Sequence, residues 1–162
     1  MATIKEYLDY AELAQSSYGL GYVAGSYLDK NGKNILIDPK NNVNFSPEQA
    51  KNFANRYEVL ATSAQYGIGD VSSFDAVLFL DHETGKKVLA IRGSQEVTDY
   101  IVDVGLGISG VVYGQNVSLN NFYDALVADN KLSLVERMDV TGHSLGGYLA
   151  QLFTASHPYT VD

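Results

Sequence analysis

The amino-acid sequence predicts an α/β protein, and three observations support this prediction. The chain has 162 residues, which suits one domain with a sizeable core. Its residues are 46% apolar and 19% charged, as in globular proteins, so extensive disorder is excluded. From about residue 71, strand patterns alternate with helix patterns, as in a sheet flanked by helices. We expect a single domain in which residues 1–70 form a helical cover segment and residues 71–162 form the sheet core.

The first predicted helix covers residues 4–17. Thr3 and Glu6 have the spacing of a capping box, in which each residue satisfies a free N–H group of the other. One apolar stripe at helical spacing follows, made of Ile4, Tyr7, Leu8, Ala11 and Ala14. Residues 19–45 show no regular period and are rich in glycine and asparagine, so we expect an irregular segment there.

A second helix begins after Ser46. Pro47 suits a first helical turn, and Gln49 completes another capping box with Ser46. The apolar face of this helix is predicted to consist of Ala50, Phe53, Ala54 and Tyr57.

The pattern changes from helical to extended at about residue 74. Residues 74–80 and 87–91 read as strands, and residues 83–86 between them have turn composition, which predicts a hairpin. Further along we expect a helix at 118–129, a strand at 135–141 and a helix at 145–157 that ends before Pro158.

Charge and composition exclude several functional classes. The formal net charge is −8, whereas a nucleic-acid-binding surface needs basic residues. The chain has no cysteine, which excludes disulfides, thiolate metal sites and cysteine nucleophiles. The first residues lack the apolar block of a secretory signal, and the longest uninterrupted apolar run, Ala76–Leu80, is too short to span a membrane.

The motif with chemical meaning is Gly142-His143-Ser144-Leu145-Gly146, which fits the pattern G-x-S-x-G. A strand pattern precedes it and a helix pattern follows it, as a nucleophile elbow requires. Such a sharp turn presents the serine hydroxyl, and the glycines let neighbouring backbone approach. The alternative interpretation is a glycine-rich turn before a core helix.

A serine nucleophile needs a base, usually a histidine held by a carboxylate. Three histidines are present. His143 lies next to Ser144 and is interpreted as structural, His157 lies at the far end of the following helix, and His82 lies next to a hairpin turn. The triad is therefore incomplete within this chain.

Three segments resemble the class 3 lipases, a family of α/β-hydrolases. Val140–Gly147 is similar to the nucleophile segment of that family, and Val88–Ser94 is similar to its strand that ends in Arg-Gly-Ser. Thr98–Asp103 resembles the segment that follows, although Tyr100 stands where tryptophan is usual. The resemblance covers residues 74–157. Within it, Tyr148 stands where a small residue is common, which is expected to alter packing under the elbow.

The resemblance implies a nucleophile at Ser144 and an oxyanion hole made by the Leu145 N–H and by Ser94. It implies an incomplete, mostly parallel α/β-hydrolase-like sheet flanked by helices, and no cofactor or metal. In the family, the aspartate and histidine of the triad follow the nucleophile, and only 18 residues follow Ser144 here. We therefore expect an N-terminal fragment that is inactive alone and lacks a C-terminal part. The alternative is a truncated, non-catalytic binding module.

The segment after Ser94 is a candidate lid. Its apolar residues have helical spacing, and the glycines at 105, 107 and 110 are a candidate hinge; the apolar residues are Val97, Tyr100, Ile101 and Val104. The alternative is an ordinary helix packed on the core. Arg92 is read either as a substrate clamp or, in preference, as an anchor for the loop before the lid.

The resulting hypothesis is a serine carboxylester hydrolase that acts on lipid esters at a lipid–water interface. The residues do not separate triacylglycerol lipase, phospholipase A1, thioesterase and polyester depolymerase activities. Many lipid hydrolases are exported, and export without an N-terminal signal peptide is compatible with the sequence.

Overall fold

The computed structural model describes residues 3–69, 73–93 and 107–161, and the side chains of residues 107–111 are left out of the description. Its elements, in chain order, are α1 (Ile4–Ser16), the 3-10 helix η1 (Pro39–Asn41), α2 (Pro47–Arg56), β1 (Tyr57–Thr62), the 3-10 helix η2 (Ser63–Tyr66), β2 (Ala76–Asp81), β3 (Lys87–Ile91), α4 (Gly107–Ala128), β4 (Asp139–Gly142) and α5 (Leu145–Ser156).

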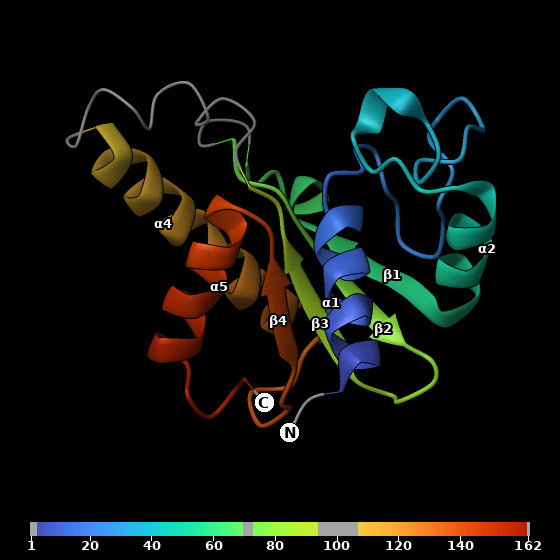
Figure 1. Cartoon of the computed structure of the whole chain (residues 1–162). Helices are drawn as coiled ribbons and strands as arrows, with labels where there is room; N and C mark the ends of the chain where they lie inside the picture. The colour runs from blue at the N-terminus through green and yellow to red at the C-terminus, as the bar shows by residue number, and fades with distance from the viewer. Residues whose placement is uncertain (1–2, 70–72, 94–106, 162) are drawn as a thin grey trace.

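The strands form one sheet in the order β1-β2-β3-β4 (Figure 1). The predicted hairpin is confirmed, because β2 and β3 pair antiparallel across a short turn. β1 is also antiparallel to β2, whereas β3 and β4 are parallel and are joined through α4. The α/β class is therefore confirmed, but the described strands are mainly antiparallel, unlike the mostly parallel sheet that was expected. Short connections allow only antiparallel neighbours, and a long crossover is needed for a parallel pair.

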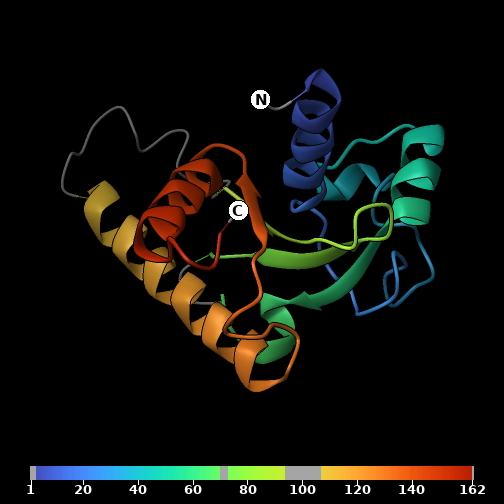
Figure 2. The same ribbon diagram turned by 90° about the horizontal axis from the view of Figure 1, so that it is seen from below.

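Helical layers cover both faces of the sheet, as Figure 2 shows. α4 and α5 pack on one face, where Leu78, Leu89 and Phe122 are fully buried. α1, α2 and the irregular segment cover the other face, which buries Phe53 and Phe79. Each fully buried apolar side chain of this size stabilises the fold by about 1.5–3 kcal/mol. None of the helices in the described part of the chain is long and apolar enough to cross a membrane.

Both predicted capping boxes are present. The Thr3 hydroxyl accepts from the Glu6 N–H, and the Glu6 carboxylate accepts from the Thr3 N–H. Ser46 and Gln49 make the same reciprocal pair at the start of α2. Each helix thus begins at the residue where its first free N–H groups are satisfied.

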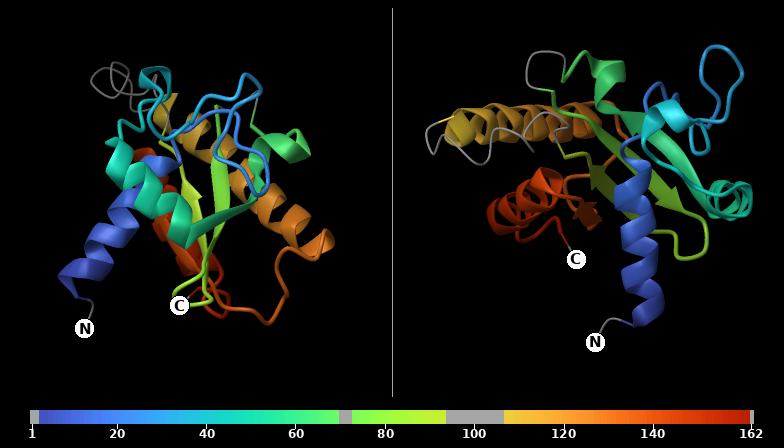
Figure 3. Two further views of the ribbon diagram at one scale, coloured as in Figure 1. Left: turned by 90° about the vertical axis from the view of Figure 1, so that its right-hand side faces the viewer. Right: turned by 45° about the horizontal axis from the view of Figure 1, so that its top comes forward.

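Only the carboxyl-terminal end of the apolar stripe predicted for α1, at Ala14, packs in the core. Ile4, Tyr7 and Leu8 are 88%, 67% and 59% exposed, and the buried apolar residues of the helix are Leu13 and Ala14. Figure 3 shows the reason, since the amino-terminal half of α1 projects past the sheet and only its carboxyl-terminal half lies over the strands.

The segment expected as a helical cover, residues 1–70, also contributes strand β1 to the sheet. Tyr57, predicted on a helix face, instead begins β1. Its burial alternates with that of its neighbours, with Tyr57, Val59 and Ala61 buried. This period of two is that of a strand with one face on the core.

Two other boundaries differ from the prediction. α4 begins at Gly107 rather than at residue 118, so the glycines at 107 and 110 lie in its first turn rather than in a hinge. β4 begins at Asp139 rather than at residue 135, because Val135 is 88% exposed and the Glu136 carboxylate pairs with Lys87 instead.

Candidate functional site

Ser144 lies in a sharp turn between β4, which ends at Gly142, and α5, which begins at Leu145. Its backbone has φ 57° and ψ −127°, a positive-φ conformation that costs a residue with a side chain about 1–3 kcal/mol. The residue is exposed, and its hydroxyl does not cap the helix that it precedes. The turn thus keeps a strained serine at the surface.

Two glycines make this turn sterically feasible. A Cβ atom at Gly142 would lie 2.4 Å from the backbone C and O atoms of Gly146. A Cβ atom at Gly146 would lie 2.2 Å from the carbonyl oxygen of Ile91, the last residue of β3. Because these neighbours are backbone atoms, a side chain at either position would displace the turn from the sheet.

The start of α5 leaves one backbone N–H group available beside Ser144. Leu145 is the first residue of α5, so its N–H has no acceptor within the helix. The following amides of Gly146 and Gly147 already donate to the His143 and Ser144 carbonyls, at 3.0 Å each. The Leu145 N–H, together with the positive end of the helix dipole, is therefore suited to an anion formed next to Ser144.

The chain that leaves β3 runs against the same turn. A Cβ atom at Gly93 would lie 2.7 Å from the His143 carbonyl oxygen and 3.1 Å from Ser144 Cβ. Ser94, the predicted second oxyanion donor, and the predicted lid residues lie outside the described residues; the lid residues are Val97, Tyr100, Ile101 and Val104.

Arg92 makes the contact expected of an anchor. Its Nη2 atom lies 2.6 Å from Asp75 Oδ2, and its side chain is only 11% exposed. The backbone N–H of Arg92 also donates to the Asp75 carbonyl, at 2.9 Å. These contacts hold the end of β3 to the start of β2 and leave the guanidinium turned inward.

The three histidines make other contacts. His143 is exposed, and its Nδ1 atom lies 2.9 Å from the Tyr18 hydroxyl. His157 stacks on Phe153 with ring centroids 4.1 Å apart, and it lies at the far end of α5, about 20 Å from Ser144. His82 lies beside Glu58, with Nε2 3.0 Å from Oε2.

Two sequence-based points concern the surroundings of the turn. Tyr148, expected to disturb packing under the elbow, is 50% exposed and leaves the buried face of α5 to Leu149 and Ala150. Sequence reasoning missed Tyr18, because its contact with His143 spans 125 residues and leaves no local pattern.

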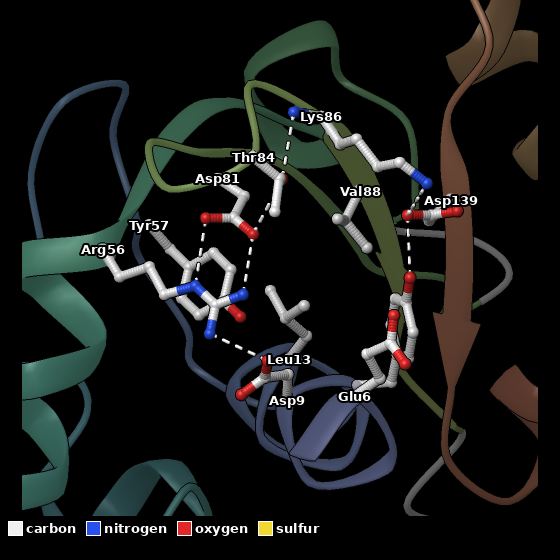
Figure 4. A pocket seen from close by; sticks show the side chains of 11 residues that line it. Glu6, Asp9, Leu13, Arg56, Tyr57, Asp81, Thr84, Lys86, Val88 and Asp139 are labelled. Atoms are coloured by element: carbon white, nitrogen blue, oxygen red, sulfur yellow. Dashed lines mark hydrogen bonds and ion pairs between the residues drawn. The ribbon is translucent and has the colours of Figure 1, made fainter. Parts of the chain in front are cut away.

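A cavity of about 90 Å³ lies at the opposite end of the sheet, between α1 and the β2–β3 turn (Figure 4). Most of its charged groups are paired with one another. Arg56 holds Asp81 with two hydrogen bonds of 3.0 and 2.8 Å and Asp9 with one of 2.8 Å. Asp139 accepts from the Tyr10 hydroxyl at 2.8 Å. Within the described residues, no cluster of three or more His, Asp or Glu side chains is arranged to hold a metal ion.

Comparisons with known proteins agree on the fold. No family model matches the sequence, and no curated protein matches it. Among solved structures, lipase II from Rhizopus niveus superposes with a TM-score of 0.59 at 19% identity, over 96% of this chain and 56% of that one. MDLA from Penicillium cyclopium superposes with a TM-score of 0.57 at 19% identity, over 100% of this chain and 62% of that one. Lip2 lipase from Yarrowia lipolytica superposes with a TM-score of 0.55 at 19% identity, over 94% of this chain and 55% of that one.

The chain has a lipase-like fold. At this identity the similarity concerns the fold alone, a mixed sheet flanked by helices of the α/β-hydrolase type. The chain spans a little over half of the length of the solved structures that it matches.

Proposed function

We propose that this chain is the N-terminal part of a serine carboxylester hydrolase that acts on lipid esters, of the triacylglycerol lipase or phospholipase A1 type. The observation that carries the proposal is the exposed Ser144, held at positive φ between β4 and α5. A residue with a side chain is kept in a strained conformation at a strand-to-helix turn when that conformation has a use, and presentation of a nucleophile is such a use.

In the proposed reaction, the Ser144 hydroxyl attacks the ester carbonyl and loses its proton to a histidine. The carbonyl oxygen becomes an oxyanion, which the Leu145 N–H and Ser94 stabilise. Loss of one such donor typically costs about 3–4 kcal/mol of transition-state stabilisation. The tetrahedral intermediate then expels the alcohol, which takes the proton from the histidine, and water releases the acyl group by the same steps.

We place the triad histidine and aspartate outside these 162 residues. The contacts of His82 and His157 described above leave His143 as the histidine beside Ser144, and its Nδ1 faces Tyr18. On this proposal, the chain is one truncated domain, with residues 1–70 as cover plus strand β1 and residues 71–162 as the sheet core.

The lipase-like fold supports lipid esters as substrates, since the solved structures that share it are named as lipases. The stripe Val97, Tyr100, Ile101 and Val104 is proposed as the lid, because a short amphipathic helix can cover an acyl groove in water and turn its apolar face to a lipid surface.

The decisive experiment replaces Ser144 by alanine in the complete protein that carries this chain. Hydrolysis of a nitrophenyl ester is expected to fall to background, and so is labelling by a fluorophosphonate probe. Ser156→Ala is the matched control, because that hydroxyl lies at the other end of α5 and bonds to the Leu152 carbonyl. Activity retained in Ser144→Ala would refute the nucleophile.

The second candidate is a non-catalytic binding module with the same fold. It is favoured by the fact that none of the three histidines is described as hydrogen-bonded to Ser144. Binding of an intact lipid ester without hydrolysis, together with no probe labelling of the complete protein, would support this candidate. The chain of 162 residues alone is expected to show no ester hydrolysis under either candidate, so robust turnover would reveal a base in an unforeseen place.

A further inference from the structure

Tyr18 touches both segments that border Ser144, although it lies just after α1 and is distant from both in sequence. Its hydroxyl oxygen is 2.9 Å from Nδ1 of His143, the residue before Ser144. The two rings meet edge to face, with centroids 5.8 Å apart. The contact therefore ties the end of the first helix to the turn that carries Ser144.

The same hydroxyl also contacts the chain that leaves β3. Gly93 packs directly against the Tyr18 oxygen. A Cβ atom at Gly93 would lie 2.9 Å from this oxygen and 3.1 Å from Ser144 Cβ, so Tyr18 and Ser144 both lie against Gly93. Only glycine allows this approach, which explains the glycine at position 93.

The contact between Tyr18 and His143 depends on which nitrogen of His143 carries the proton. A tyrosine hydroxyl has one proton to donate and lone pairs that accept. The Tyr18 hydroxyl has a proton to donate, and its donation to His143 Nδ1 requires that this nitrogen be the unprotonated one of a neutral ring.

We propose that Tyr18 is a positioning residue that holds the Gly93 segment against the His143–Ser144 turn and fixes His143 as the Nε2–H tautomer. The inference rests on the proposed function, because the two segments carry the two proposed oxyanion donors. Ser94 follows Gly93, and Leu145 follows Ser144. Donors on separate segments must keep a fixed spacing to act on one oxyanion, and displacements of about 1 Å already lower rates.

Tyr18 is suited to this role by its surroundings. Burial raises the pKa of its hydroxyl and outweighs the opposing effects of the Gly93 N–H and of Arg92. The group therefore keeps its proton at neutral pH and remains able to donate it. The alternative is simple packing, since the ring also lies against the apolar cluster under α1.

The first test reads the tautomer directly by nitrogen NMR of histidine-labelled protein in mildly alkaline buffer. In the complete protein that carries this chain, His143 is expected to show Nε2 protonated and Nδ1 unprotonated, assigned through a His143→Gln variant. In Tyr18→Phe, His143 should shift toward the mixture of tautomers that a free imidazole shows. A protonated Nδ1 in the unaltered protein, or an unchanged spectrum in Tyr18→Phe, would overturn the inference.

The second test separates positioning from packing by kinetics. Tyr18→Phe keeps the ring and is expected to lower kcat for a short-chain nitrophenyl ester about tenfold while KM changes by less than about twofold, because only transition-state contacts are lost. Tyr22→Phe is the matched control, since it removes a hydroxyl that donates to the Ser16 carbonyl, away from the turn. Its kcat should equal that of the unaltered protein.

The outcomes distinguish the inference from the proposed function. Equal kcat values in Tyr18→Phe and the unaltered enzyme would overturn the positioning role while leaving the hydrolase intact. If the unaltered protein hydrolyses no ester, both the proposed function and the catalytic part of the inference are overturned. The NMR measurement of the His143 tautomer then still tests the hydrogen bond between Tyr18 and His143.

Discussion

The two ends of the parallel pair β3–β4 are built on opposite principles. At the amino end, Asp139 opens β4 beside a cavity whose charged side chains are matched with partners. At the carboxyl end, Gly142 closes β4 and leads into a strained, exposed serine. In α/β sheets, ligands bind outside the carboxyl ends of the strands, where helix N-termini gather. The charged cavity is thus structural, whereas the end with an unsatisfied helix terminus is the candidate site.

The comparison shows how structural polar groups differ from those of a candidate functional site. Arg56, Asp9 and Asp81 satisfy one another and join α1 to α2 and β2, so they have little left to offer a ligand. At the other end, the structure keeps Ser144 at positive φ and packs glycine backbone at contact distance around it. Fully paired charges fix a fold, whereas local strain without an evident gain in stability marks a functional site.

The largest effect on stability is expected at the amino end, from Arg56→Ala. The Arg56 side chain is 16% and the Asp81 side chain 6% exposed, and removal of one partner leaves the other charge poorly solvated. Loss of a partner from a buried pair costs about 3–5 kcal/mol, and we expect about 3 kcal/mol here. Urea unfolding measures the loss.

Ester hydrolysis by the remaining folded protein is expected to be unchanged in Arg56→Ala. Arg56→Lys serves as the control, because it keeps the charge but loses the two-point contact with Asp81. A variant that folds normally but loses activity would show that the two ends are coupled and would break the comparison.

Gly146→Ala tests the carboxyl end and combines a smaller loss of stability with a loss of function. The added methyl would lie 2.2 Å from the Ile91 carbonyl oxygen, which cannot move without moving β3. Overpacking of this kind costs about 1–3 kcal/mol. Unlike Arg56→Ala, it should also reduce kcat in the complete protein, because Leu145 and Ser144 move with the turn.

Gly147→Ala is the matched control for Gly146→Ala. A methyl at that position would meet the Gly142 carbonyl oxygen at 3.1 Å, a contact that a shift of a few tenths of an ångström relieves. If both variants lose stability and activity equally, the close approach to β3 does not fix the turn.

The amino end of the β3–β4 pair, which holds Asp81 in a charged pair, should make the stability of the protein depend on acid pH. Burial raises the pKa of Asp81, but hydrogen bonds from Arg56, from the Glu83 N–H and from the Thr84 hydroxyl outweigh it and lower the pKa to about 2. The lowered value means that the ionised carboxylate stabilises the folded state above the unfolded pKa of about 4. This contribution, about 2 kcal/mol, is lost as the pH falls from about 4 to about 2.

The measurement is the free energy of unfolding between these pH values in the unaltered protein and in Asp81→Asn. The variant should be less stable at neutral pH and should lose less stability on acidification. Parallel pH profiles for the two proteins would contradict the assigned role of Asp81.

Sequence reasoning succeeded where the cause of a structure is local. Thr3 and Glu6 fix a helix start through atoms three residues apart, and the turn at 83–86 determines the hairpin around it. The strand-to-helix turn at Ser144 was predicted for the same reason, since its glycines and flanking patterns are contiguous.

The remaining features depend on contacts that no local pattern encodes. Ile4 and Leu8 have helical spacing, but their exposure depends on how far the sheet extends beneath α1. Strand β1 follows α2 without a loop, so the helical period hid the extended one. The contact between Tyr18 and His143 exists only because α1 lies beside β4.

The smallest expected effect comes from Leu8→Ser, on the exposed half of α1. Because the Leu8 side chain is 59% exposed, its replacement should change the free energy of unfolding of this chain by no more than about 0.5 kcal/mol. Leu13→Ser, at 1% exposure on the same helix, is the contrasting variant and should cost several times more. A substantially larger loss for Leu8→Ser in the complete protein than in this chain would mean that a further part of the protein covers α1, and the amino end would then be an interface rather than a free surface.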